Sequence, residues 1–428
     1  MKRRALLYFS YIATLLIAAA CIPLTPAAGP TPTPPSSADT LTPIALTSTP
    51  IATDTLVPEI TPTTGTTEVP ATPTQGSASG GQFLAYISNG QLLVTDVTNN
   101  VKGGTTQYTV AGVSDHVTDL VWSPSGEFIA FVAAPQGDQH VFYIFALGQS
   151  SPTDLGPGSA PAWSPDSQSL AYVGGTYPDN NIWITSVETP APHQLTSQTN
   201  YAWGRPAFTP DGQSLVVAGA DRNNMGAQGN TQFTLEYLEL DGSGTRTPLP
   251  GAAFMDGVRL PQDLRFSPNG SSLAFSTSSH ISACAAPGAY YVISQNSTAP
   301  LELVSPSLKS FIDPGNERYN SGLSYAWTAA SDGLVALGQV IDCAANSPTS
   351  GQIIAGPQMS VLGLDGSERT IIPGFFFGIS MDRTGNLIAA AHFQNGFQDL
   401  NPNVEIYSAQ TGQLVLPVGP GNSPQFQP

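Results

Sequence analysis

The sequence predicts an all-β fold built from one repeated four-stranded unit, and three observations support this prediction. A short motif of an aromatic residue, a tight turn and an apolar strand recurs through residues 81–428. Over the same residues, β-branched and aromatic side chains stand in short runs that Gly, Asn, Asp and Pro interrupt, which is typical of strands and turns. We find no amphipathic pattern that would indicate a helix of about ten residues or more.

The motif is clearest in residues 120–131, where Trp122 precedes a Ser-Pro-Ser-Gly turn and a second strand follows. An apolar residue stands seven positions after the aromatic residue or methionine in six copies, which are Trp122/Ile129, Trp163/Leu170, Phe208/Leu215, Phe266/Leu273, Trp327/Leu334 and Met381/Ile388. The copies are separated by 41, 45, 58, 61 and 54 residues, enough for four strands each. This spacing indicates the blades of a β-propeller, in which the turn itself is a structural element.

The two ends of the repeated region complete each other. The strand at 83–87 matches the second strand of a blade, but no first strand precedes it. The last residues resemble a first strand, and Phe426 follows Met381 by 45 residues. We therefore expect a seven-bladed β-propeller closed by pairing of its N- and C-terminal strands, which removes two exposed sheet edges.

Residues 1–20 are typical of a lipoprotein signal peptide. Lys2, Arg3 and Arg4 precede an apolar stretch, and Ala18, Ala19 and Ala20 supply small residues before Cys21. The pattern resembles the lipobox of bacterial lipoproteins, whose cysteine is lipidated, although Ala18 stands where Leu is usual. It predicts a protein of the bacterial cell envelope, outside the cytoplasm and lipid-anchored to the membrane at Cys21. An ordinary signal peptide that gives a secreted protein and an uncut membrane anchor are the alternatives.

Residues 21–80 are predicted to be a disordered tether. Residues 22–80 contain 12 Pro and 16 Thr and no aromatic residue, Lys or Arg. Such a segment buries too little apolar surface to offset its ordering entropy. We expect it to hold a folded domain, residues 81–428, away from the membrane.

Charge and motifs exclude several function classes. The formal net charge is −17, and about −20 without Lys2, Arg3 and Arg4. An acidic surface repels phosphate backbones, so we expect no nucleic-acid partner. No GxSxG, HExxH, P-loop or dinucleotide motif is present, and no cysteine or histidine spacing indicates a metal. We therefore assign no catalytic residue, metal or cofactor, and an enzyme is the less favoured hypothesis.

The longer loops give the first set of candidate binding residues. If the Ser-Pro turns lie on one face of the propeller, the loops between second and third strands lie on the opposite face, which we call the insert-loop face. Binding residues concentrate in loops on a rigid scaffold. We therefore expect a ligand surface around Arg222, His280, Asp342 and His392. Four ordinary solvated loops are the alternative.

A second set follows from the repeat. The residues three positions before each repeat aromatic residue or methionine are Asp119, Ala160, Arg205, Asp263, Ser324, Gly378 and Ser423. We expect them to begin the innermost strands, near one mouth of the central channel. Asp119, Arg205 and Asp263 are then candidates to bind a small polar ligand or a cation, and solvated charges are the alternative.

Two cysteines are candidates for a disulfide. Cys284 and Cys343 each follow the second strand of their blade, and the two blades are consecutive. Equivalent loops of adjacent blades are neighbours, and an oxidising exterior favours a disulfide between them. Separate buried thiols are the alternative.

The turn sequence also resembles a known repeat. A Trp-Ser-Pro-Asp/Ser-Gly turn followed by Leu-Ala-Tyr or Ile-Ala-Phe resembles the WD40-like PD40 repeat of TolB-type propellers, over residues 81–428. The resemblance implies a fold whose members serve as periplasmic or surface binding proteins, or as propellers attached to peptidases. Our hypothesis is a non-catalytic, surface-anchored propeller that binds a protein or carbohydrate ligand. The alternative is an extracytoplasmic lyase or hydrolase for polysaccharide or small polar substrates, since fold does not fix function.

Overall fold

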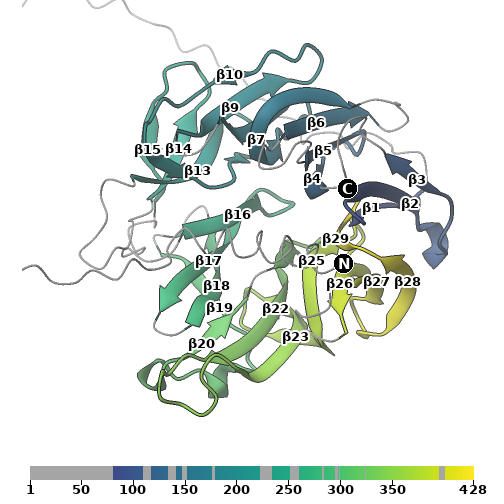
Figure 1. Ribbon diagram of the computed structural model, residues 1–428, viewed down its shortest axis with the longest axis vertical. Helices are drawn as coiled ribbons and strands as arrows, with labels where there is room; N and C mark the ends of the chain where they lie inside the picture. Colours follow the sequence, from purple (N-terminus) through teal and green to yellow (C-terminus); the bar gives the residue numbers. More distant parts are fainter. Residues whose placement is uncertain are drawn as a thin grey trace, which may run out of the picture. The chain divides into compact units, whose positions relative to one another are not determined.

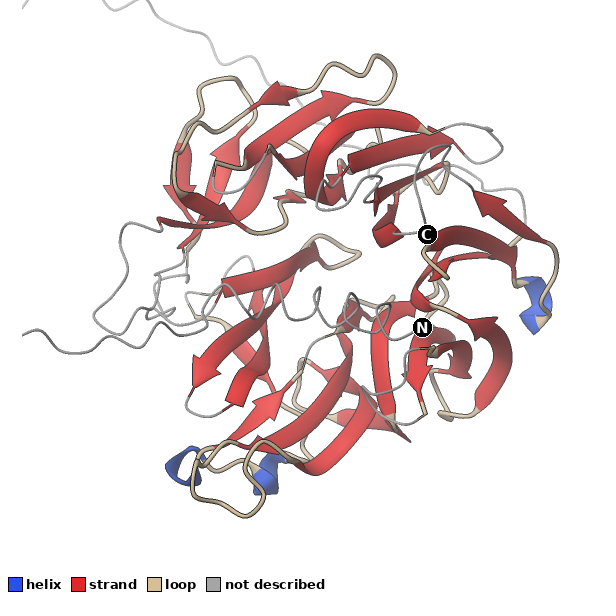
Figure 2. Cartoon of the chain, viewed as in Figure 1, coloured by secondary structure: helices blue, strands red, loops and turns tan. Residues whose placement is uncertain are grey.

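The computed structural model describes residues 81–108, 117–133, 141–146, 152–175, 179–221, 234–250, 260–281, 284–294, 297, 299–322, 324–394 and 401–428. Its regular structure is almost entirely β (Figure 2), and the described helices are the short 3₁₀ turns η1 (Thr98–Asn100), η3 (Lys309–Phe311) and η4 (Pro314–Asn316). No helix within the described ranges is long and apolar enough to span a bilayer. The predicted signal peptide, Cys21 and the predicted tether lie outside the described residues.

The strands form antiparallel sheets that follow one another around a ring (Figure 1), so the fold is an all-β propeller. The first sheet has the order β29-β1-β2-β3, with β1 (Phe83–Ser88), β2 (Gln91–Asp96), β3 (Thr105–Tyr108) and β29 (Asn422–Phe426). The second has the order β10-β9-β8-β7-β6-β5-β4, with β4 (Val117–Trp122), β5 (Phe128–Ala133), β6 (Val141–Ala146), β7 (Thr153–Trp163), β8 (Ser169–Gly174), β9 (Asn181–Ser186) and β10 (His193–Gln194).

The remaining four sheets come from residues 201–420. The third contains β11 (Tyr201–Trp203), β12 (Ala207–Phe208), β13 (Ser214–Asp221), β14 (Thr234–Glu239) and β15 (Arg246–Pro248). The fourth contains β16 (Leu260–Phe266), β17 (Ser272–Ile281), β18 (Cys284–Ser294) and β19 (Leu301–Leu303). The fifth contains β20 (Arg318–Ser321), β21 (Tyr325–Trp327), β22 (Gly333–Asp342), β23 (Ile353–Gly363) and β24 (Glu368–Pro373). The sixth contains β25 (Phe375–Met381), β26 (Leu387–Phe393), β27 (Asn403–Ser408) and β28 (Leu414–Pro420).

The expectation of seven separate blades is wrong, because the described strands form six sheets. The physical reason is the length of β7, which has 11 residues. Its first part, through Pro157, pairs with β6, and its second part, from Gly158, pairs with β8. One strand thus ends one repeat unit and begins the next, which fuses two expected blades into a seven-stranded sheet.

The pairing of the two ends is present as expected. Strand β29 pairs antiparallel with β1, with Phe426 opposite Leu84. The backbone N–H of Gln427 then donates to the carbonyl of Phe83 at 2.9 Å. Figure 1 shows the C-terminus beside β1. The C-terminal strand is therefore the innermost strand of the first sheet.

The repeated turn has one geometry in all six copies. Its first side chain accepts a hydrogen bond from the backbone N–H five residues later, at 2.8–3.1 Å, in the turns that start at Ser123, Ser164, Thr209, Ser267, Thr328 and Asp382. The fourth residue has φ between 61° and 73°, and is Gly126, Ser167, Gly212, Gly270, Ser331 or Gly385. Even the two turns with degenerate sequences keep this geometry, which agrees with a structural role for the motif.

The hydrophobic core lies between neighbouring sheets. One cluster joins Tyr290 of β18 and Trp327 of β21, on consecutive sheets. Three repeat tryptophans also donate an indole N–H to a carbonyl of the preceding unit: Trp163 to Val121 at 3.1 Å, Trp327 to Arg265 at 2.9 Å and Trp122 to Gln425 at 3.0 Å. Each acceptor is the residue just before the equivalent aromatic position. The repeat aromatic residue therefore connects each of these units to the preceding one.

Candidate functional site

The seven positions predicted to begin the innermost strands lie inside those strands instead, at irregularities. The pairing register shifts beside Asp119, Ala160, Asp263, Gly378 and Ser423, and Arg205 and Ser324 lie in breaks between short strands. Four of the seven have positive φ, namely Ala160 at 55°, Asp263 at 54°, Gly378 at 64° and Ser423 at 50°. A bulge places an extra residue in one strand and redirects its side chain. At five of the seven positions the expected strand start is thus corrected to a bulge, whereas Arg205 and Ser324 lie just before the short strands β12 and β21.

The bulges bring the predicted charged residues together. Arg205 forms an ion pair with Asp119 through Nη2, and its Nε lies 3.8 Å from Oδ1 of Asp263. Its Nη1 donates to the carbonyl of Pro161 at 2.7 Å. Arg205 therefore contacts residues of β4, β7 and β16 in addition to its own sheet.

Sequence reasoning missed the fourth member, Arg265. Its Nε lies 2.9 Å from Oδ1 of Asp263 and its Nη2 lies 2.9 Å from Oδ2, a bidentate pair that fits the planar guanidinium. Its guanidinium carbon also lies 5.7 Å from the ring centre of Tyr325. Burial alone would lower the pKa of Arg265, but Asp263, Tyr325 and Asp119 raise it above its ordinary value. The available signal was the spacing Asp263-x-Arg265 at a repeat position.

We call Asp119, Arg205, Asp263 and Arg265 the inner-strand cluster. Their side chains keep 30%, 20%, 28% and 35% of their accessible surface, so all four are partly exposed. Two carboxylates face two guanidinium groups, and the formal charge of the cluster is zero. The cluster can exchange one of its ion pairs for a polar ligand, but it holds no unpaired charge that would attract a free cation.

The second predicted region places His392 at the end of β26, opposite the turn at 382–385. His392 Nδ1 lies 2.9 Å from Oε2 of Glu405, and the same oxygen accepts a hydrogen bond from the hydroxyl of Tyr407. Phe376 stacks on the imidazole with ring centres 4.8 Å apart. The His392 side chain is 25% exposed and that of Glu405 is 11% exposed. The three contacts fix the imidazole on a rigid sheet.

Burial and the neighbouring Glu405 carboxylate raise the pKa of Tyr407 above its ordinary value. Tyr407 therefore stays a hydrogen-bond donor to Glu405 at neutral pH. Glu405 and Tyr407 were missed from the sequence, because only the pairing of β26 with β27 brings them beside His392. No sequence spacing between these residues indicates the contact.

Asp342 ends β22 and is buried, with 1% of its surface exposed. Its carboxylate accepts hydrogen bonds from the hydroxyls of Ser347 at 2.6 Å and Thr349 at 2.5 Å, and from the backbone N–H of Ala344 at 3.1 Å. These hydrogen bonds lower the pKa of Asp342. Asp342 thus organises its own loop.

The other predicted residues fall largely outside the described part. Arg222 lies outside it, and for His280 only the backbone, in β17, is described. Cys343 is buried and disulfide-bonded. The side chain of Cys284 is not described, so their pairing stays a prediction. Among the described residues, no group of three His, Cys, Asp or Glu side chains could hold a metal ion.

Comparisons with known proteins concern the fold. No family model matches the sequence, and no curated protein matches it either. Prolyl oligopeptidase B from Galerina marginata is 12% identical, with a TM-score of 0.50 over 80% of this chain and 50% of that chain. TolB from Acinetobacter baumannii is 13% identical, with a TM-score of 0.40 over 81% of this chain and 67% of that chain. An oligogalacturonate lyase in complex with manganese is 14% identical, with a TM-score of 0.47 over 79% and 85%.

These neighbours differ in what their names say they do, and at such identities they show the fold alone. The order of the sheets and the closure by β29 indicate the same fold. The described part of the chain is a β-propeller.

Proposed function

We propose that residues 81–428 are a non-catalytic binding or scaffolding propeller with a carbohydrate or protein ligand on the insert-loop face. The signal peptide and Cys21 would place it outside the cytoplasm on a lipid anchor, with residues 21–80 as the tether. The observation that carries the non-catalytic part is the pairing within the inner-strand cluster. Arg205 joins Asp119 and Asp263, and Arg265 holds Asp263 in a bidentate pair.

This pairing favours a structural role over catalysis at the centre of the ring. Asp119 and Asp263 each have a guanidinium as ion-pair partner, so both carboxylates are engaged in contacts within the protein. The inner-strand cluster is therefore better suited to connecting the units that surround it than to acting on a substrate.

The ligand surface is placed around His392 because this imidazole is held rigidly and remains 25% exposed. Glu405, Tyr407 and Phe376 fix its orientation before any ligand arrives. Such preorganisation lowers the entropy cost of binding. An imidazole presented in this way can donate or accept one hydrogen bond with a hydroxyl or amide of a ligand.

The test is a glycan array with the full-length protein and two variants, His392→Ala and His193→Ala. His193 is exposed on β10 and serves as the matched control. We expect a glycan signal that is lost in His392→Ala and kept in His193→Ala, with no release of reducing ends from the bound glycan. Equal binding by both variants would remove His392 from the ligand surface. If the protein binds no glycan on the array, the carbohydrate ligand is contradicted and a protein is the remaining ligand class of the proposal.

The alternative function is an extracytoplasmic lyase or hydrolase, and one observation favours it. The pair of His392 and Glu405 at 2.9 Å is the arrangement in which a carboxylate orients an imidazole for proton transfer. Release of unsaturated or reducing products that stops in Glu405→Gln would support the enzyme and overturn the non-catalytic proposal.

The lipid anchor is a separate part of the proposal. When bacterial cells that express the protein are grown with a radioactive fatty acid, the wild-type protein should become labelled and the Cys21→Ala variant should not. Equal labelling of the two proteins would contradict the anchor at Cys21.

We also propose that the seven-stranded sheet contains two copies of the sequence repeat, which share β7. The two repeat tryptophans of that sheet, Trp122 and Trp163, support this count, because each donates to the unit before it.

Mass spectrometry of unreduced peptides tests the proposed pairing of Cys284 with Cys343, and a free thiol at Cys284 would disprove it.

A further inference from the structure

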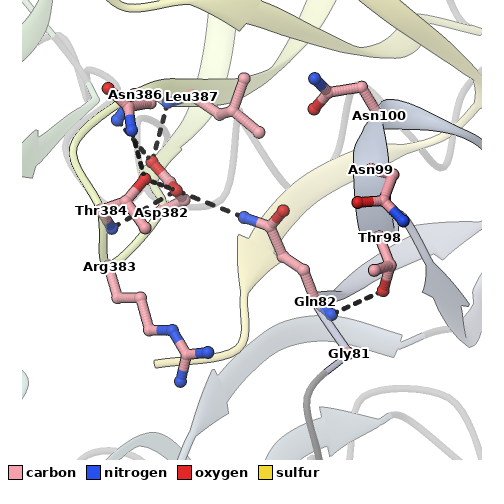
Figure 3. Close-up of a pocket in the computed structure, with 10 residues that line it drawn as sticks. All are labelled: Gly81, Gln82, Thr98, Asn99, Asn100, Asp382, Arg383, Thr384, Asn386 and Leu387. Carbon is pink, nitrogen blue, oxygen red and sulfur yellow. Dashed lines mark hydrogen bonds between the residues drawn. The ribbon is translucent and has the colours of Figure 1, made fainter.

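A pocket of about 340 Å³ lies where the first and last units of the propeller meet (Figure 3). One wall comes from the first sheet and the turn after β2. The other comes from the turn between β25 and β26. The residues that line it are Gly81, Gln82, Thr98, Asn99, Asn100, Asp382, Arg383, Thr384, Asn386 and Leu387. We call it the seam pocket, and it contains none of the residues proposed above to bind a ligand.

The seam pocket is lined mainly by hydrogen-bonding groups. Gln82, Asn99, Asn100 and Asn386 contribute side-chain amides, which both donate and accept hydrogen bonds. Asn99 and Asn100 also have positive φ, at 58° and 59°. Asn is one of the few residues besides glycine that adopt this conformation readily, which suits both residues to this turn. The lining therefore suits a polar ligand with several hydroxyl groups.

Arg383 is the cationic group of the seam pocket. Its side chain is exposed, and within the described part of the chain it makes no ion pair or hydrogen bond. In contrast, Arg205, Arg246, Arg265 and Arg369 each contact a carboxylate. The chain has only 13 Lys and Arg against 30 Asp and Glu, so an arginine without a carboxylate partner in a pocket is unusual here.

The acidic residue of the seam pocket, Asp382, is already engaged. Its Oδ1 accepts hydrogen bonds from the backbone N–H groups of Asn386 at 2.9 Å and Leu387 at 2.8 Å. Its Oδ2 accepts from the backbone and hydroxyl of Thr384 and, at 3.4 Å, from Nε2 of Gln82. Asp382 is 2% exposed, so its charge is buried in its own turn. The guanidinium of Arg383 is then the charged group that the pocket offers to a ligand.

We propose that the seam pocket binds a small carboxylate that also carries hydroxyl groups, such as a sugar acid. The carboxylate pairs with the Arg383 guanidinium, whose planar fork matches it, and the hydroxyls bond to the amides of Asn99, Asn100 and Asn386. The volume of the pocket lies at the lower end for small-molecule sites. At roughly 30 Å³ per water molecule, it holds the equivalent of about eleven waters, which suits a single sugar ring.

The experiment is isothermal titration of the full-length protein with sodium glucuronate, with glucose as the neutral counterpart of the same shape. We expect glucuronate to bind at least about 10-fold more tightly than glucose, because a charge-assisted hydrogen bond is stronger than a neutral one. Arg383→Ala should weaken glucuronate binding by a similar factor. Asn99→Asp, which adds a negative charge at a position with positive φ that Asp tolerates, should also weaken it.

Two matched variants complete the test. Arg369→Ala removes an exposed arginine that pairs with Asp332 on another turn, so it should leave the Kd for glucuronate unchanged. His392→Ala should also leave it unchanged, which separates the seam pocket from the proposed function. The proposal is overturned if glucuronate does not bind, if glucose binds equally well, or if Arg383→Ala retains the wild-type Kd.

Discussion

Trp122 donates its indole N–H to the backbone carbonyl of Gln425, at 3.0 Å between Nε1 and O, across 303 positions of sequence. This hydrogen bond joins β4 to the C-terminal strand, and the pairing of β29 with β1 completes the closure. Trp163 makes the equivalent bond to Val121 between units that follow each other directly in the chain. The ring is thus closed by the same contact that Trp163 and Trp327 make with the units before them.

Trp122→Phe should lower the free energy of unfolding by about 1 kcal/mol, since it removes one hydrogen bond and keeps most of the aromatic packing. Trp163→Phe should cost a similar amount. Deletion of residues 422–428 should cost much more, because it leaves β1 as an exposed edge. Urea denaturation followed by tryptophan fluorescence measures all three, and a deletion that is as stable as the wild type would show that β29 is dispensable.

Arg205 and Asp119 should be energetically coupled. Both side chains keep less than a third of their exposed surface, so the pair is screened less than a surface ion pair. A double-mutant cycle with Arg205→Met and Asp119→Asn should give a coupling free energy of about 1 kcal/mol. Raising the salt concentration from low to about 1 M should reduce this coupling only in part. A coupling near zero would show that the ion pair does not contribute to folding.

Two glycines in equivalent turns should respond differently to alanine. Gly212 and Gly270 have φ of 70° and 72°. Both substitutions therefore place an alanine in the left-handed region, which costs about 1 kcal/mol of stability. A Cβ at Gly212 has its nearest neighbour at 3.7 Å, whereas one at Gly270 would meet Pro210 Cβ at 2.8 Å. Gly270→Ala should therefore cost about 1 kcal/mol more than Gly212→Ala. Thermal unfolding of the two variants compares them, and equal losses would contradict the role of Pro210.

Asp342 should make stability depend on pH in the acid range. Hydrogen bonds from Ser347, Thr349 and Ala344 hold its folded pKa below the ordinary value of 3.8. The carboxylate therefore contributes stability above pH 3.8, and this contribution is lost as the pH falls through the lower folded pKa. Asp342→Asn should flatten the stability profile below about pH 4, and Ser347→Ala with Thr349→Ala should do so in part. Urea denaturation at several pH values measures this, and an unchanged slope in Asp342→Asn would refute it.

The repeat could be predicted from the sequence because its turn is local. In each turn the first side chain accepts a hydrogen bond from the backbone N–H five residues later, and this keeps the turn at a fixed length. The repeat spacing of seven residues is therefore kept even where Asp382 replaces Ser. The closure by Phe426 was predictable for the same reason, since it copies a local pattern. The number of sheets was not, because it depends on whether Thr153–Trp163 bends between its two partners.

The residues of the candidate site could be predicted only where they occupy a fixed position in the sequence repeat. The offset of three residues before each aromatic position found Asp119, Arg205 and Asp263, which the structure brings together. It did not reveal the bulges, because Ala160 and Asp263 adopt positive φ without a glycine to indicate it. The contacts of Asp342 with Ser347 and Thr349 could not be predicted, because no sequence spacing indicates how the loop after β22 folds.

The pairing of β29 with β1 also means that these two strands meet where the other units have their connecting turn. Phe426 faces Leu84 as Trp122 faces Ile129, but no covalent link joins the two strands. A circular permutant that links residue 428 to residue 81 through a short turn and begins at residue 117 would keep every strand pairing within the ring. In that permutant β29 and β1 would be joined by a turn, as the equivalent strands of the other units are.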